Sequence, residues 1–199
     1  FIFFGEQIAA EDRIVINFES PPSLNQEAKL IQNIKNYNSV QSIENYLMQQ
    51  NWIENFLIKS SFFGKFHQIF IQSKKPKYVW KDKFYIDSQV STFAYDGGYP
   101  DLIRLNMPLE YLTFWIKAEN QYITLFNDLS LTIRSVGFQP AVGWYLITSD
   151  ALRVNLGDEL SNDTYQKLSF TLKYMFENNL TPSIIDLRYK AGAALNYGK

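Results

Sequence analysis

Several features that would point to particular functions are missing from this 199-residue sequence. It contains no cysteine, which excludes disulfides, thiol nucleophiles and thiolate metal ligands. No run of about 18 apolar residues exists, which is the length that a membrane-spanning helix needs. The formal net charge is −1 and there is no basic stripe, so the sequence argues against nucleic acid as a partner.

Apolar and aromatic residues are abundant instead. Hydrophobic residues make up 46% of the chain and aromatic residues 17%, which is the composition of a folded protein rather than a disordered tail. A chain of this length can bury one good core or two small ones. No repeat, low-complexity tract or flexible linker divides it.

The first 76 residues show the patterns of a small α+β unit. β-branched residues alternate in RIVINF, which predicts a strand. Apolar residues then recur at helical spacing, and either Ser39 or Ser42 can cap a second helix. Two apolar-rich runs joined at a glycine follow, which is typical of a hairpin. The predicted elements are a strand at 13–18, helices at 24–34 and up to Met48, and a hairpin at 52–76 that turns around Gly64-Lys65 and ends at Pro76.

Eight apolar side chains of these elements are predicted to share one core. The prediction places both helices on one side of a three-stranded sheet, with the first strand in that sheet. The eight residues are Ile14, Ile16, Leu30, Ile34, Ile43, Leu47, Ile58 and Ile69.

After Pro76 the chain changes to short strands with two helices. Turn residues gather in YDGGYPDL, and Pro108 can open a helix that reaches about Phe126. The predicted fold class is α+β: a small βααββ domain followed by a larger antiparallel β domain with two helices and a C-terminal edge hairpin. The other elements predicted are strands at 77–80, 84–88, 90–94, 129–136, 143–149 and 151–157, a helix at 162–179 and a hairpin from 182.

Residues that could catalyse a reaction or bind a metal are scarce. The single histidine, His67, falls within a strand without the partners that a metal site needs, so a surface or half-buried position is expected. Asp158, Glu159 and Asp163 could form an acid/base pair, but acids at the start of a helix also favour its dipole. DGGYPD is not followed by the helix start or the Lys-Ser/Thr of a phosphate-binding loop. We predict no catalytic residue, no metal and no cofactor.

The chain begins with four bulky apolar residues, Phe1 to Phe4, and then turns polar. One interpretation is a short strand at the start of a domain. The other is that these residues are the outer end of a membrane helix, which predicts about 15 further apolar residues upstream in the gene. In this second interpretation residues 1–12 are a membrane-proximal stub.

Three stretches of the sequence resemble the FtsQ/DivIB family of bacterial division proteins. The order of the first elements resembles a POTRA domain, and the stretch from Trp52 has the Pro, Trp, Asp and Phe spacing of the family. The second stretch is GWYLITSDALRVNLG, and the third and most specific is DLRYKAGAAL. The matching positions are Trp52, Pro76, Trp80, Asp87, Phe93, Trp144, Leu156, Gly157 and the run from Asp186 to Leu195.

The resemblance implies a single-pass inner-membrane protein with this segment in the periplasm at the division site. Residues 13–76 would be the POTRA domain and residues 77–199 the β domain. Such proteins are divisome scaffolds without catalytic activity. They bind FtsB- and FtsL-like coiled-coil proteins, contact other divisome proteins through the POTRA domain, and help to regulate septal peptidoglycan synthesis.

Two other interpretations fit parts of the sequence. A POTRA-containing periplasmic module of a transport or outer-membrane assembly factor would repeat the unit or continue into a membrane barrel. A hydrolase with a carboxylate pair would need a concave pocket with two acids within about 10 Å of each other. We expect no such pocket.

The last 15 residues, IDLRYKAGAALNYGK, predict a hairpin. Its first strand is expected at 183–189, with Ile185, Leu187 and Tyr189 on one side, and its return strand at 193–197. The turn at Lys190 to Gly192 contains a glycine, which can take a positive φ. The return strand either is buried against a neighbour or stands at the sheet edge, where it would be an aggregation hazard unless covered.

The resemblance implies the edge, with an FtsB-like segment adding itself as one more strand. Tyr189 would be the aromatic anchor, Arg188 would pair with an acidic residue of the partner, and the small Ala193 and Ala194 would let another backbone approach. The predicted partner-binding residues are Arg188, Tyr189, Ala191, Gly192, Ala193, Ala194, Leu195, Asn196 and Tyr197.

Overall fold

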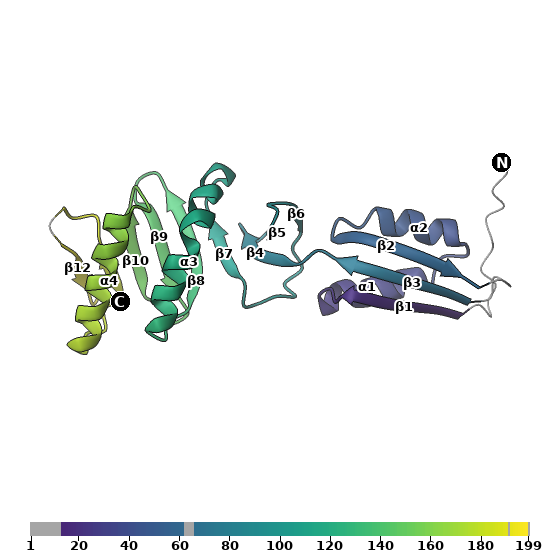
Figure 1. The fold of residues 1–199 in the computed structure, drawn as a ribbon, viewed down its shortest axis with the longest axis horizontal. Helices are drawn as coiled ribbons and strands as arrows, with labels where there is room; N and C mark the ends of the chain where they lie inside the picture. Colours follow the sequence, from purple (N-terminus) through teal and green to yellow (C-terminus); the bar gives the residue numbers. More distant parts are fainter. Residues whose placement is uncertain (1–12, 62–65, 191, 199) are drawn as a thin grey trace. The chain divides into compact units, whose positions relative to one another are not determined.

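The computed structural model describes residues 13–61, 66–190 and 192–198 (Figure 1). The chain divides into two compact units, Phe1–Lys77 with Lys83–Pro100, and Tyr78–Asp82 with Asp101–Lys199. The apolar stub at Phe1 to Phe4 and the predicted turn at Gly64-Lys65 lie outside the described residues. The predicted domain boundary after residue 76 stays a prediction.

The first unit contains a three-stranded sheet with two helices on one face (Figure 1). Its elements are β1 (Arg13–Ser20), α1 (Leu24–Ile34), α2 (Val40–Met48), β2 (Ile53–Ser60) and β3 (Phe66–Ser73), followed by the antiparallel pair β5 (Phe84–Asp87) and β6 (Thr92–Ala94). The strand order is β1-β3-β2, with β1 parallel and β2 antiparallel to β3. Along β3, His67, Ile69 and Ile71 are buried and the residues between them are half-buried, so the helices cover one face.

Both helices begin at serine caps. The hydroxyl of Ser23 accepts a hydrogen bond from the N–H of Gln26, whose side chain accepts one from the N–H of Ser23, so the two form a capping box. Ser39 caps α2 by accepting from the N–H of Ser42. Of the two candidate caps, Ser39 is therefore the one used, and the predicted helices at 24–34 and up to Met48 are confirmed.

The core of this unit lies between the helices and β3. The predicted core residues Leu30, Ile34, Ile43, Leu47 and Ile69 are all buried, whereas Ile14, Ile16 and Ile58 are only half-buried because β1 and β2 are the outer strands. The expectation for His67 is wrong, since its side chain is 1% exposed. Its Nδ1 lies 2.8 Å from the hydroxyl of Ser60, which satisfies one ring nitrogen inside the core.

A loop after β6 is fastened to the start of α1 through Asp96. The carboxylate of Asp96 accepts hydrogen bonds from the hydroxyls of Ser23 and Tyr85 and from the N–H of Gly98. Burial alone would raise the pKa of Asp96, but these hydrogen bonds outweigh it and hold the pKa below its ordinary value. A Cβ on Gly98 would lie 2.2 Å from the Cβ of Ser23, so the loop can approach α1 only with glycine at this position.

We predict that Asp96→Asn destabilises the first unit by about 2 kcal/mol, because a neutral amide accepts weaker hydrogen bonds than a carboxylate. The carboxylate's contribution is present above the ordinary Asp pKa of about 3.9 and is lost as the pH falls through the lowered folded pKa. Urea unfolding at a series of acidic to neutral pH values should show a flatter pH profile for the variant. Glu54→Gln, which changes an exposed acid of the same unit, should keep the wild-type profile. A wild-type profile for Asp96→Asn would contradict this role.

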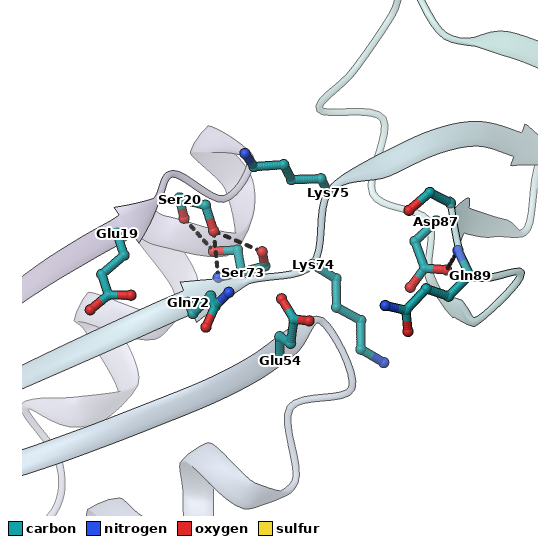
Figure 2. A pocket seen from close by; sticks show the side chains of 10 residues that line it. Glu19, Ser20, Glu54, Gln72, Ser73, Lys74, Lys75, Asp87 and Gln89 are labelled. Carbon is teal, nitrogen blue, oxygen red and sulfur yellow. Dashed lines mark hydrogen bonds between the residues drawn. The ribbon is translucent and has the colours of Figure 1, made fainter.

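A polar cavity of about 380 Å³ opens in the first unit (Figure 2). Beside it, the hydroxyl of Ser20 donates to the carbonyl of Ser73 at 2.8 Å and accepts from the N–H of Ser73 at 2.9 Å, which joins the ends of β1 and β3. The lining contains both acidic and basic side chains, so the cavity favours neither anionic nor cationic ligands. These side chains are Glu19, Glu54, Lys74, Lys75 and Asp87.

The second unit is a sheet with two long helices on one face (Figure 1). Its elements are β4 (Pro76–Trp80), which enters the unit at Tyr78, β7 (Ile103–Asn106), the 3-10 turn η1 (Leu109–Tyr111), α3 (Leu112–Asp128), β8 (Ile133–Gln139), β9 (Gly143–Thr148), β10 (Arg153–Gly157), α4 (Asn162–Glu177), β11 (Ile184–Asp186) and β12 (Ala194–Asn196). The strand order is β12-β11-β10-β9-β8-β7-β4. Val154 and Leu156 of β10 are buried on the helix-covered face.

The expectation of an antiparallel sheet is wrong for three of the pairings. β7 runs parallel to both β4 and β8, and β10 runs parallel to β11. The chain passes through α3 between β7 and β8, and through α4 between β10 and β11, and such a crossover returns the chain in the same direction. β7 is absent from the predicted strands because its four residues directly follow a run of turn residues.

Candidate partner-binding edge

The closing hairpin places β12 at the end of the sheet in the second unit. β12 pairs antiparallel with β11, with Leu195 opposite Ile185 at the centre of the pairing. Within residues 13–61, 66–190 and 192–198, no strand pairs with the outer side of β12. The return strand therefore stands at an edge and is not buried between two neighbours.

The hydrogen bonds of β11 show which backbone groups of β12 face outward. The carbonyl of Ser183 and the N–H of Leu187 bond to β10, so the alternate residues Ile184 and Asp186 direct their backbone groups towards β12. Their partners on β12, Asn196 and Ala194, therefore bond inward. It follows that the N–H and C=O of Leu195, which lies between these two partners, point away from the sheet.

The side chains of β12 divide between the two faces of the sheet. Leu195 lies opposite the fully buried Ile185 and is itself half-buried on the helix-covered face. Ala194 and Asn196 lie on the other face and are exposed. Because Ala194 is small, another chain can approach this end of the strand closely.

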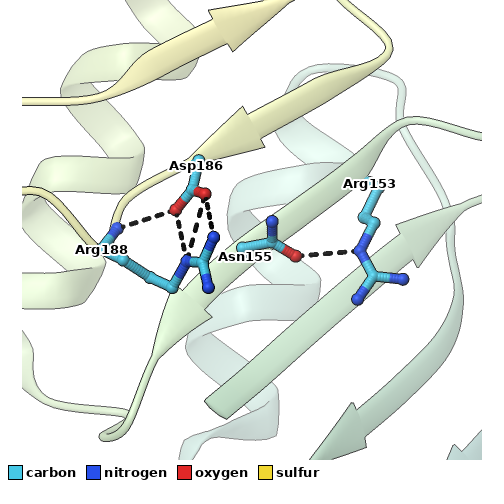
Figure 3. A network of polar contacts seen from close by, with 4 residues as sticks. All are labelled: Arg153, Asn155, Asp186 and Arg188. Carbon is cyan, nitrogen blue, oxygen red and sulfur yellow. Dashed lines mark hydrogen bonds and ion pairs between the residues drawn. The ribbon is translucent and has the colours of Figure 1, made fainter. Parts of the chain in front are cut away.

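The open face beside β12 carries a row of polar side chains (Figure 3). Arg188 holds Asp186 in a forked contact, with Nε 2.9 Å from Oδ1 and Nη2 2.6 Å from Oδ2. Hydrogen bonding by Arg188 lowers the pKa of Asp186. On β10, the Nε of Arg153 donates to Asn155 at 2.9 Å, and its guanidinium lies 4.3 Å from the ring centroid of Tyr145. Arg188 is therefore already paired within the chain, so an acidic partner residue would have to share its guanidinium with Asp186.

Tyr189 is largely exposed but does not lie on a strand. β11 ends at Asp186, because the Asp186 carboxylate accepts the backbone N–H of Arg188 at 3.1 Å and so turns the chain out of the extended conformation. The side chain of Tyr189 is 60% exposed. The backbone carbonyls of Tyr189 and Leu187 accept hydrogen bonds from Nζ of Lys167 on α4, at 2.7 and 3.1 Å respectively. Lys167 thereby holds the loop that presents Tyr189.

The turn of the hairpin requires a glycine for its backbone conformation. Gly192 has a φ of 144°, a value that other residues rarely adopt. No described atom lies within 4 Å of the place where its Cβ would be, so the requirement is conformational and not steric. Ala191, also predicted to contact the partner, lies outside the described residues.

An apolar cavity of about 650 Å³ adjoins the end of β12. Tyr197, which is 56% exposed, lines it together with Met175 and Phe176 of α4. The hydroxyl of Ser183 lies 3.1 Å from the carbonyl oxygen of Asn196 and 2.6 Å from that of Gly198, and these hydrogen bonds fix this end of the hairpin. The sequence does not reveal this cavity, because its walls come from four segments that are separate in the chain.

A second cavity of the same unit, of about 550 Å³, is lined by Asp158 and Glu159. The expectation that no concave pocket would hold two acids is therefore wrong. Both residues are exposed, so the cavity lacks the contrast between a buried and a solvated carboxylate that separates an acid from a base in glycosidase-like sites. In the part of the chain that the structure describes, no three His, Asp or Glu side chains are grouped so that they could hold a metal ion.

Comparison with known proteins gives two relatives with the same name, and no family model matches the chain. The cell division protein FtsQ of Aliivibrio fischeri is 19% identical over 166 residues, which cover 79% of this chain and 62% of the relative. The cell division protein FtsQ of Vibrio cholerae is 24% identical over 139 residues, which cover 65% of this chain and 51% of the relative. This chain is thus similar, over roughly half to 62% of their length, to two proteins that are named as cell division proteins.

The α-helices of the described residues are α1, α2, α3 and α4. None of them combines the length and the apolar character that crossing a bilayer requires.

Proposed function

We propose that this chain belongs to an FtsQ-like, non-catalytic division scaffold that binds an FtsB-like coiled-coil protein by strand addition at β12. The observation that supports this most strongly is the outward direction of the Leu195 backbone on an edge strand. Tyr197, which directly follows this strand, and Tyr189, in the loop between β11 and β12, are both exposed. In strand addition, backbone hydrogen bonds supply affinity and side-chain contacts supply specificity. The similarity to two FtsQ proteins supports the division role.

The wider architecture of this proposal follows the same resemblance. Residues 13–76 are a POTRA domain that contacts other divisome proteins, and residues 77–199 are a β domain that binds FtsB- and FtsL-like partners and helps to regulate septal peptidoglycan synthesis. The segment lies in the periplasm, with a membrane helix encoded upstream of Phe1. The βααββ order of the first unit supports the POTRA assignment.

The cavity beside Tyr197 suggests what the partner carries next to its added strand. Met175, Phe176 and Tyr197 offer an apolar surface at the point where β12 ends. A partner segment that continues past this point can bury an apolar side chain there, and each buried methylene contributes about 0.8 kcal/mol. We therefore expect the partner to have a bulky apolar residue beside its strand.

Capture from inner-membrane extract of the native host tests this function. The immobilised chain should retain small single-span coiled-coil division proteins, identified by mass spectrometry. A Leu195→Pro variant, which lacks the outward N–H, should not retain them. Circular dichroism must first show that the variant is folded. Retention of transport or outer-membrane assembly factors instead, or equal retention by both versions, would contradict the proposal.

A further inference from the structure

The cavity lined by Asp158 and Glu159 has features that strand addition at β12 does not use. Its walls are formed by the start of α3, by Trp144 of β9 and by residues 158–161, which lead into α4. One wall is aromatic and the other is acidic. This combination is characteristic of sites that bind cations.

The aromatic wall is a fixed cluster. Tyr111 stacks on Phe138 with ring centroids 4.0 Å apart and 18° between the ring planes, and it meets Trp144 edge-on at 6.0 Å. Phe114 lies 6.2 Å from Tyr111 and is 58% exposed. A single exposed aromatic ring needs no explanation, but here the ring lines a cavity and extends a packed cluster. The cluster therefore offers ring faces to a ligand at little cost in side-chain entropy.

The acidic wall carries negative charge that the described residues do not neutralise. Within residues 13–61, 66–190 and 192–198, the side chains of Asp158 and Glu159 take part in no ion pair. The positive N-terminal end of the α4 dipole would repel a cation. The Ser161 cap and the negative charge of Asp163 in the first turn offset this positive end. Lys117 is the single cation among the described lining residues, so the lining is negative on balance.

We propose that this cavity binds an arginine side chain of a protein partner. A guanidinium group is planar, so it can stack on Tyr111 or Phe114, and its forked N–H groups match the carboxylates of Asp158 and Glu159. A lysine ammonium supplies the charge without the plane and should bind less well. An anionic side chain would meet two carboxylates and should not bind.

Titration of the full chain with the peptide acetyl-Gly-Arg-Gly-amide, followed by NMR, tests this inference. Saturable shifts are expected for the indole N–H of Trp144 and the amides of Phe114 and Glu159, with a dissociation constant of about 1 mM. The matched peptide with Lys in place of Arg should bind about threefold more weakly. The matched Gln and Glu peptides should give no saturable shift. Equal binding of the Arg and Gln peptides would overturn the proposal.

Charge variants distinguish binding of the peptide at this cavity from a response to the net charge of the protein. Asp158→Asn combined with Glu159→Gln should weaken binding of the Arg peptide by about tenfold, because both acceptors lose their charge. Asp101→Asn combined with Asp128→Asn makes the same change in net charge at exposed acids elsewhere in the unit and should leave binding unchanged. If the two double variants weakened binding equally, the peptide would be responding to net charge and the proposal would be wrong.

Two further substitutions, with one control, test the rest of the lining. Phe114→Ala should weaken binding, whereas Phe170→Ala, which removes an even more exposed ring from α4, should not. Lys117→Gln should strengthen binding because it removes the opposing cation. Loss of binding in Phe170→Ala, or weaker binding in Lys117→Gln, would count against the proposal. None of these measurements involves β12, so the result is independent of strand addition.

Discussion

Replacing Tyr189 with alanine is expected to weaken binding of the FtsB-like partner by about 30-fold, or about 2 kcal/mol, while the protein stays folded. The side chain is 60% exposed, so its removal leaves no cavity in a core. The Tyr189 carbonyl that Lys167 binds is retained in the variant. An exposed ring in the loop that leads to an edge strand can bury much of its area against an incoming chain, which is how aromatic anchors act at interfaces. Calorimetry with the purified partner measures the change.

A matched control is available on α4. Tyr174 is exposed to nearly the same extent as Tyr189, at 57%, and Tyr174→Ala should bind the partner like the wild type. Circular dichroism of both variants verifies the fold. If Tyr189→Ala bound with wild-type affinity, or if the two variants lost affinity equally, Tyr189 would not be the anchor.

The largest effect on stability is expected for Gly143→Ala, at about 3 kcal/mol or more of unfolding free energy. Gly143 has a φ of 79°, which strains any residue with a Cβ. A Cβ at this position would also lie 2.3 Å from the carbonyl carbon of Gly157, which belongs to the neighbouring strand β10. Accommodating it would force β9 and β10 apart at the position where Trp144 pairs with Gly157.

Gly97→Ala separates the two causes of this loss. Gly97 has the same φ of 79°, but no described atom lies within 4 Å of its Cβ position. Gly97→Ala should therefore lower the free energy of unfolding only by the backbone strain, about 1 kcal/mol. Urea unfolding of both variants makes the comparison. Equal losses would mean that the close approach of β9 and β10 contributes nothing.

The helices of the first unit could be predicted because their signals are local. Ser23 and Gln26 form a capping box within four residues, and the apolar spacing that predicts α1 is contained in the helix itself. The parallel pairings of β7 and of β10 with β11 could not be predicted in the same way. Strand direction depends on which strands become neighbours, and these neighbours are distant in the sequence.

The candidate edge shows a similar division between local and distant information. The hairpin at the end of the sequence left burial and an edge position open for the return strand, the resemblance implied the edge, and β12 stands at the edge. The position of Tyr189 off the strand results from the contact of Asp186 with Arg188 two residues later, a local signal that strand alternation alone overlooks. The hydrogen bond from Lys167 to this loop depends on how α4 packs, and no pattern in the sequence indicates it.

Hydrogen exchange of the Leu195 amide, measured by NMR in the free protein and in the complex with the partner, tests strand addition most directly. In the free protein this N–H points away from β11 and should exchange quickly. In the complex it donates to the added strand, and its exchange should slow by about 100-fold or more. The amide of Ala194, which bonds inward, is the internal control and should change little. An unchanged exchange rate for Leu195 at saturating partner would contradict docking at this edge.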